Sequence, residues 1–178
     1  EAVEAGITLL DLAPRYGNGE AELVIGAAFG GKLPRGVRVS TKCAVGAPPL
    51  REVPSILERS LDESQARMNL EHVDLFFLHG LIIPDDAVDH PPGTPWSLYV
   101  GAVRPAMQRL VERGRIGAWA ISGIGVPTQI IAAMEADPAP AAVQAIANLL
   151  DSPGGLKRYA GPPRPREIIA TAVRRSIA

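Results

Sequence analysis

The sequence predicts an α/β fold, a parallel (β/α)8 TIM barrel that this chain covers only in part. Short apolar runs alternate with longer segments whose hydrophobic residues recur at helical spacing, which is typical of repeated strand-helix units. The runs are almost entirely apolar, as expected for parallel strands buried on both faces. Five such units fit, and no G-x-G-x-x-G motif follows the first strand, which favours an incomplete barrel over an open dinucleotide-binding sheet.

The five strands are expected at residues 7–12, 37–42, 73–79, 117–122 and 142–147. Residues 1–6 have the pattern of the last turn of a helix. A barrel of this kind usually has about 250 residues. We therefore expect a chain that is incomplete at both ends, with residues 1–178 forming one partial barrel domain.

Each strand is followed by a segment of helical periodicity. The first helix is expected to begin near Asn18 or Glu20 and to end at Gly30, because glycine favours the left-handed backbone of a helix end. Proline is favourable in a first turn, and it opens three later helices, at Pro54, Pro127 and Pro165. The residues expected on the buried faces are Leu23, Val24, Ala27 and Ala28; Val53, Ile56, Leu57 and Leu61; Val103, Met107, Leu110 and Val111; Ile130, Ile131 and Met134; and Ile168, Ile169 and Val173.

The segment 81–98 interrupts this rhythm with a proline- and aspartate-rich stretch between a strand and its helix. Such a loop lies at the carboxyl end of the strands, where it can either cover an active site or serve as a solvated connector. Trp96 in this loop could line a substrate pocket.

Composition narrows the classes of partner. The chain has 178 residues and a formal net charge of -1, and no cluster of Lys and Arg is dense enough to track a nucleic acid or an anionic membrane. No apolar run approaches the roughly 20 residues of a membrane span. The single cysteine, Cys43, excludes an internal disulfide and fits a cytoplasmic location. His72 and His90 have no second ligand at metal spacing, so no metal site is expected.

Polar residues gather at the carboxyl ends of the predicted strands. Asp11, Lys42, His79 and Ser122 each lie at or next to the last residue of a different strand, and Gln144 lies within the fifth strand. In a barrel these positions converge on one end, where the active site is built. An isolated Asp or Lys at a strand end is usually a cap or a solvated charge, but four polar residues at the ends of four successive strands indicate a site.

Three motifs resemble those of the aldo-keto reductases. Asp-Leu-Ala-Pro-Arg-Tyr-Gly begins at Asp11, Val-Ser-Thr-Lys ends at Lys42, and Asp-Leu-Phe-Phe-Leu-His ends at His79. The family carries Asp-x-Ala-x-x-Tyr-Gly, Thr-Lys and Asp-Leu-x-x-x-His in this order, and residues 144–151 look like its sixth strand. The resemblance implies about strands 2 to 6 of the barrel with their helices.

The resemblance further implies that Tyr16, Asp11, Lys42 and His79 form the catalytic group of an oxidoreductase that reduces an aldehyde or ketone, or runs the reverse oxidation. Carbonyl reduction requires a hydride at carbon and a proton at oxygen. Tyr16 is the candidate proton donor, because a nearby lysine ammonium favours release of a phenolic proton. Asp11 would hold Lys42 charged, and His79 would hydrogen-bond the substrate oxygen.

For the cofactor, the resemblance implies NADPH and leaves NADH open. Asp11, Ser122, Gly123 and Gln144 are the implied cofactor-binding residues, with Ser122 and Gln144 near the nicotinamide carboxamide. The family usually has Asn after this Ser, where the present chain has Gly123. We expect Gly123→Asn to restore one amide contact.

Two other functions remain open. Lys42 at a strand end could form a Schiff base in a lyase, and a barrel of this family could serve as a regulatory or redox-sensing subunit with little turnover. Cys43 is expected to be a small buried residue rather than an activated thiolate. Since the phosphate site of such barrels commonly follows the seventh and eighth strands, we expect the 178-residue chain alone to be inactive.

Overall fold

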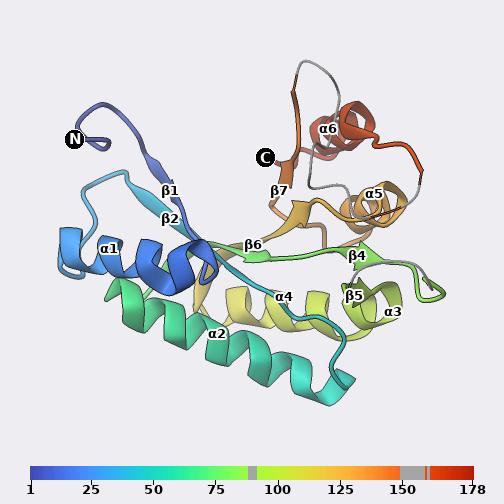
Figure 1. Cartoon of the computed structure of the whole chain (residues 1–178), viewed down its shortest axis with the longest axis horizontal. Coiled ribbons are helices and arrows are strands. Elements are labelled where there is room, and N and C mark those ends of the chain that lie inside the picture. Colours follow the sequence, from blue (N-terminus) through green and yellow to red (C-terminus); the bar gives the residue numbers. More distant parts are fainter. Residues whose placement is uncertain (88–91, 149–158, 160) are drawn as a thin grey trace.

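The framework of the molecule is a curved, fully parallel sheet of five strands (Figure 1). The computed structural model describes residues 1–87, 92–148, 159 and 161–178. His90 and residues 149–151 of the predicted sixth-strand motif lie outside this part. The strands, in their order across the sheet, are β1 (Leu9–Asp11), β2 (Arg38–Cys43), β3 (Val73–Leu78), β6 (Ile116–Gly123) and β7 (Ala142–Ala145). All five predicted strands are therefore confirmed, with ends that differ by a few residues.

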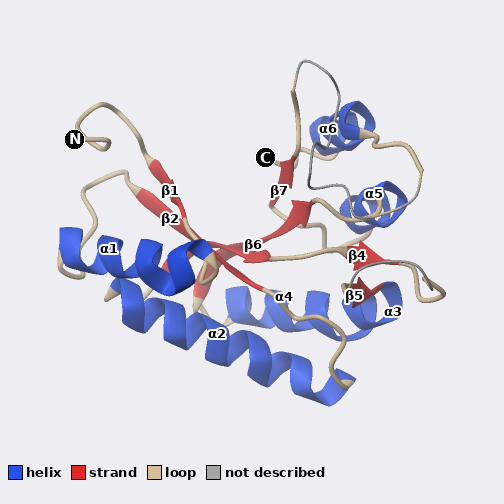
Figure 2. Ribbon diagram, in the orientation of Figure 1, coloured by secondary structure: helices blue, strands red, loops and turns tan. Residues whose placement is uncertain are grey.

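Helices follow the outer side of the sheet (Figure 2). They are α1 (Glu20–Phe29), α2 (Val53–Met68), α3 (Trp96–Leu98), α4 (Arg104–Glu112), α5 (Pro127–Glu135) and α6 (Pro165–Arg174). Helix α2 packs on β2, α4 on β6, and α6 on β7. Each main strand is thus followed by a helix on the same side, which is the predicted strand-helix pattern. Among the described residues, no helix is long and apolar enough to span a membrane.

Most of the core lies in the outer layer, which we define as the space between the sheet and its helices. Because side chains alternate along a strand, Val39, Phe76 and Ile121 point into this layer and are fully buried. Helix α2 contributes Val53, Leu57 and Leu61 to the same cluster, as the helical spacing predicted. The outer layer therefore forms one continuous cluster.

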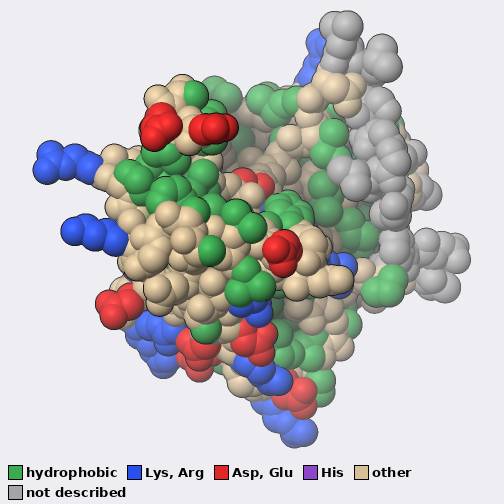
Figure 3. Space-filling view, turned by 60° about the vertical axis from the view of Figure 1, so that its left-hand side comes forward, with side chains coloured by type: hydrophobic (Ala, Val, Ile, Leu, Met, Phe, Trp, Pro, Cys, Tyr) green, Lys and Arg blue, Asp and Glu red, His purple; other side chains and the backbone are tan. Residues whose placement is uncertain are grey.

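The opposite side of the sheet, here called the inner face, has a much smaller core. Its buried residues are Phe77, Ala120 and Ala142, with Leu75 packed against them. Leu9 at the edge strand β1 keeps 44% of its side chain exposed. A cavity of about 400 Å³ lies against this face, and Figure 3 shows hydrophobic side chains at the surface beside a hollow.

Two helices differ from prediction in the face that they bury. In α1, Leu23 and Val24 are 48% and 53% exposed, and the residue that is fully buried is Glu22. A Cβ at Gly26 would lie 2.5 Å from the carbonyl oxygen of Arg67. Helix α1 therefore packs against α2 with the side that carries Gly26 and Glu22, because only a glycine permits this close approach. The predicted apolar stripe faces solvent instead.

The second difference is in α6, where Ile168 is buried as predicted but Val173 is 73% exposed. Thr171 and Ala172 take its place in the core. The chain then turns back after α6, and Ala178 exchanges backbone hydrogen bonds with residues 141 and 143 at the β7 edge. The predicted helical turn at residues 1–6 is a set of hydrogen-bonded turns, with one bond of helical spacing from the Ala5 amide to the Glu1 carbonyl.

The predicted loop at 81–98 contains a small second sheet. Strands β4 (Ile82–Ile83) and β5 (Thr94–Pro95) pair in parallel. Trp96 stacks on Tyr99, with ring centroids 5.6 Å apart, and packs against the outer-layer core. Trp96 does not line the cavity that adjoins Lys42 and His79, and its place in the wall of a substrate pocket stays a prediction.

Candidate active site

The centre of the site is an ion pair between two neighbouring strands. Lys42 near the end of β2 is 1% exposed, and its Nζ donates to Asp11 Oδ1 at 2.8 Å and to the Leu12 carbonyl at 2.8 Å. Ser40 Oγ donates to the same Asp11 oxygen at 2.6 Å. Because β1 and β2 run parallel with Asp11 opposite Ser40, the sheet itself holds the ammonium in place.

Asp11 stays ionised in this setting. Partial burial alone would raise its pKa, but hydrogen bonds from Lys42 and Ser40, and the Lys42 charge, lower it below the usual value. A hydrogen bond with the Gln144 side chain acts in the same direction. Gln144 belongs to β7 at the other edge of the sheet, so its side chain reaches across the inner face to Asp11.

Tyr16 follows β1 in a tight turn that brings its ring over the ion pair. The turn needs left-handed backbone at three successive residues, with φ of 61° at Gly17, 53° at Asn18 and 94° at Gly19. Glycine and asparagine tolerate this conformation best, which explains the Tyr-Gly-Asn-Gly sequence. The Lys42 Nζ lies 4.8 Å from the centroid of the Tyr16 ring, and 41% of Tyr16 remains open to solvent.

His79 completes the group from β3. Its backbone amide donates to the Cys43 carbonyl at 2.7 Å, and its ring lies edge-on to that of Tyr16, with centroids 6.3 Å apart and an angle of 84°. Burial, together with the charges of Lys42 and Arg15, lowers the pKa of His79 against an opposing effect of Asp11. The imidazole is therefore neutral near pH 7, where one ring nitrogen can donate a hydrogen bond without adding a positive charge.

The structure thus brings Asp11, Tyr16, Lys42 and His79 together at one end of the sheet. Cys43 next to Lys42 points the other way, is 3% exposed, and burial raises the pKa of its thiol. Cys43 is therefore the small buried residue that we expected, and the alternative of an activated thiolate is contradicted. Among the described residues, no group of three or more His, Cys, Asp or Glu side chains is placed to bind a metal ion.

Ser122 and Gln144 lie side by side across the inner face from the ion pair. They are register partners in the parallel pairing of β6 with β7. Ser122 is 4% exposed, and Gln144 is half-buried. A hydroxyl and a primary amide at this position can donate to and accept from an amide group, which is the donor set that a nicotinamide carboxamide requires.

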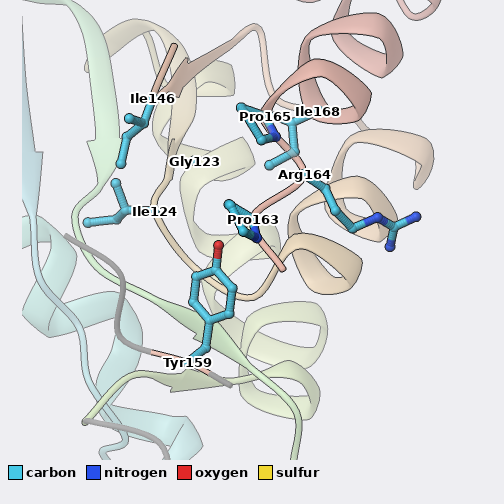
Figure 4. Close-up of a pocket in the computed structure, with 8 residues that line it drawn as sticks. All are labelled: Gly123, Ile124, Ile146, Tyr159, Pro163, Arg164, Pro165 and Ile168. Carbon is cyan, nitrogen blue, oxygen red and sulfur yellow. The ribbon is translucent and has the colours of Figure 1, made fainter. Parts of the chain in front are cut away.

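Gly123 behaves differently from the expectation. A Cβ at this position would lie 2.8 Å from the Gln144 carbonyl and 3.2 Å from Ala145 Cα. The expectation that Gly123→Asn restores a cofactor contact is therefore wrong, because an asparagine would displace the backbone of β7. Gly123 also lines a small cavity with Tyr159 and Pro163 (Figure 4).

Two features of the site were not found from the sequence. The first is Arg15, which lies between the motif residues Asp11 and Tyr16 and lines a cavity with His79. The second is buried Glu22, which accepts hydrogen bonds from Thr41 Oγ1 at 2.5 Å and from Arg67 Nε at 2.6 Å. Arg15 stands at a position that the motif Asp-x-Ala-x-x-Tyr-Gly leaves open to any residue, so the motif does not single it out. Hydrophobic periodicity places charged residues such as Glu22 on the solvent side of a helix.

The family follows from comparison with known sequences. The profile of the aldo/keto reductase family matches residues 1–162. The chain belongs to this family. It is 27% identical over 124 residues to methylglyoxal reductase YeaE of Escherichia coli, and 26% identical over 119 residues to an oxidoreductase of Mycobacterium tuberculosis. These matches cover 68% and 66% of the present chain, and the chain spans only about a third of each relative, 36% and 31%.

Solved structures show the same fold. An aldo/keto reductase of Klebsiella pneumoniae, in complex with NADP and acetate, superposes with a TM-score of 0.68 at 22% identity, covering 99% of this chain and 52% of that one. A glycerol dehydrogenase of Gluconobacter oxydans gives 0.67 at 23% identity, covering 99% and 49%. The chain therefore spans about half the length of these barrels, and the predicted incomplete (β/α)8 barrel is confirmed.

Proposed function

We propose that this oxidoreductase chain carries the catalytic group of an enzyme that reduces an aldehyde or ketone to an alcohol, or oxidises the alcohol, with NADPH as cofactor. The observation that carries the proposal is the Lys42 ammonium, fixed 2.8 Å from Asp11 and 4.8 Å from the centre of the Tyr16 ring. The NADPH and NADP in two similar solved structures support the choice of cofactor.

Each residue has a role that its surroundings permit. Tyr16 is partly exposed beside the buried ammonium, so its hydroxyl can donate a proton to a carbonyl oxygen while the Lys42 charge stabilises the resulting phenolate. Asp11 keeps the ammonium in place. Neutral His79 donates a hydrogen bond to the same oxygen, which orients the carbonyl and stabilises charge as it develops.

The cofactor would lie along the inner face, with its carboxamide at Ser122 and Gln144. NADPH supplies the hydride when it is bound. Gln144 also contacts Asp11, so the residue that holds the cofactor amide also borders the ion pair beside Tyr16. We place the substrate carbonyl beside Tyr16 and His79, where the cofactor at Ser122 and Gln144 can reach it across the inner face.

The geometry disfavours the lyase alternative. A Schiff base requires a free amine lone pair, whereas the Lys42 Nζ donates to both Asp11 and the Leu12 carbonyl. Its 1% exposure also prevents a substrate carbon from reaching it without a rearrangement. Lys42 is thus an electrostatic partner of Tyr16.

The proposal is tested by Tyr16→Phe in the protein produced from its complete reading frame. Loss of the proton donor should lower kcat for carbonyl reduction by roughly 10²- to 10⁴-fold and leave NADPH binding, measured by calorimetry, nearly intact. Tyr99→Phe is the matched control, because Tyr99 is buried in the outer layer away from the site. Equal turnover by the Tyr16→Phe variant and the wild type would refute the assignment.

A further inference from the structure

A second cavity opens directly beside the catalytic group. It has a volume of about 280 Å³. Its walls come from the segment after β1, from the end of β2, and from the first half of α2. The lining residues are Pro14, Arg15, Lys42, Cys43, Ala44, Ile56, Arg59, Ser60, Glu63 and His79. Lys42 and His79 thus border both the reaction centre and this cavity.

The cavity has more positive than negative charge available to a ligand. Lys42 is neutralised by Asp11 at 2.8 Å, and the lining has one acidic side chain, Glu63, whose neighbour Arg67 at 3.9 Å already pairs with Glu22 at 2.6 Å. The two arginines of the lining thus outnumber its single free carboxylate. Within the part of the chain that the structure describes, neither Arg15 nor Arg59 forms an ion pair. Two guanidinium groups therefore remain for a bound anion.

Arg15 and Arg59 approach the cavity from different elements. Arg15 precedes Tyr16 in the turn after β1, and Arg59 lies on α2. Arg15 is near enough to His79 for its charge to help lower the pKa of that imidazole. A ligand group in the cavity would therefore lie next to a carbonyl held at Tyr16 and His79.

We propose that this cavity binds the anionic end of the substrate, so that the enzyme prefers carbonyl compounds that carry a carboxylate or phosphate. The inference rests on the proposed function for its reaction and names the substrate class. A guanidinium group forms paired, charge-assisted hydrogen bonds with either oxyanion. Both arginines are exposed, so the preference weakens as salt screens their charge.

The test compares 4-formylbenzoate with its methyl ester, which has similar size and no charge. Wild-type enzyme should show a kcat/KM for the carboxylate at least about tenfold above that for the ester, and Arg15→Gln combined with Arg59→Gln should remove this ratio. Arg113→Gln is the control, because Arg113 is an exposed arginine paired with Glu58. Equal rates with both compounds in the wild type, or a ratio that survives in the double variant, would overturn the proposal.

Calorimetry separates this inference from the proposed reaction. If neither aldehyde is reduced, the proposed reaction is wrong. Binding of 4-formylbenzoate in the presence of NADP then tests by itself whether the cavity binds an anion. Binding that the double variant loses supports the site, and identical binding of acid and ester refutes it. A parallel titration of glyceraldehyde 3-phosphate against glyceraldehyde identifies whether phosphate or carboxylate is the better anion.

Discussion

The two faces of the sheet differ in both packing and chemistry. The outer layer is a closed core in which Leu57, Phe76 and Ile121 are fully buried or nearly so. The inner face has a cluster of only three buried hydrophobic residues and borders a cavity of about 400 Å³. Yet the ion pair of Asp11 with Lys42, and Ser122 and Gln144 of the predicted cofactor residues, lie on the inner face.

This difference separates stability from function. Buried apolar area holds a domain together, and here most of it lies in the outer layer. Substitutions there should change the free energy of unfolding, and substitutions on the inner face should change chemistry. The same type of substitution can therefore be used on each face to test the separation.

The largest effect is expected at Glu22, the buried carboxylate of the outer layer. Glu22→Ala removes the partner of Arg67 Nε and leaves the buried Thr41 hydroxyl without its acceptor. Breaking such a pair from one side costs about 3 kcal/mol of unfolding free energy, the low end of the range because 25% of Arg67 is exposed. Urea unfolding followed by circular dichroism measures the loss.

The matched control is Glu58→Ala, which breaks an exposed ion pair with Arg113. Surface pairs contribute about 0–1 kcal/mol, so this variant should unfold nearly as the wild type does. Glu22→Gln should lie between the two, because the amide keeps the size of the side chain and an oxygen for Thr41. If Glu22→Ala and Glu58→Ala were equally stable, the buried network would not contribute to folding.

A smaller effect of opposite sign is expected at Tyr99. This side chain is fully buried in the outer layer, and within the described residues its hydroxyl has no hydrogen-bond partner. Tyr99→Phe removes a polar group that was desolvated without compensation and should stabilise the protein by about 1 kcal/mol. Tyr16→Phe at the exposed site should leave the unfolding free energy nearly unchanged and lower kcat by roughly 10²- to 10⁴-fold. A destabilised Tyr99→Phe variant would indicate a partner for the hydroxyl.

The sequence predicted the outer layer well where burial is apolar. Helix α2 repeats Val53, Leu57 and Leu61 at helical spacing, and all three are buried. The prediction failed in α1, where the buried position is Glu22 and Leu23 is exposed. Hydrophobic periodicity cannot identify a carboxylate that is buried because a threonine and an arginine from other elements satisfy it.

For the site, strand ends were sufficient to group three of the four catalytic candidates, whereas Tyr16 was predicted only from the motif resemblance. Parallel strands bring their carboxyl ends to one edge, so Asp11, Lys42 and His79 could be grouped before any coordinates were known. The Gly123 contact could not be judged in this way, since the room at that position depends on how closely β7 approaches β6. The free charges of the cavity likewise depend on which arginines find partners after folding.

The smallest expected effect is the decrease in the free energy of unfolding at acid pH that arises from His79 on the inner face. The folded pKa of His79 lies below its ordinary value of 6.5, so below that pH the unfolded chain binds a proton that the folded chain does not. The free energy of unfolding should therefore fall as pH drops from 7 through 6.5, and the fall ends at the folded pKa.

Asp11, with an ordinary value of 3.8 and a lowered folded pKa, contributes in the same direction only below about pH 4, so its effect begins at a lower pH than that of His79. His79→Asn should flatten the decline between pH 7 and 5, whereas His72→Asn, at an exposed turn, should not. Parallel declines in the wild type and His79→Asn would show that burial and the charges of Lys42 and Arg15 do not perturb this imidazole.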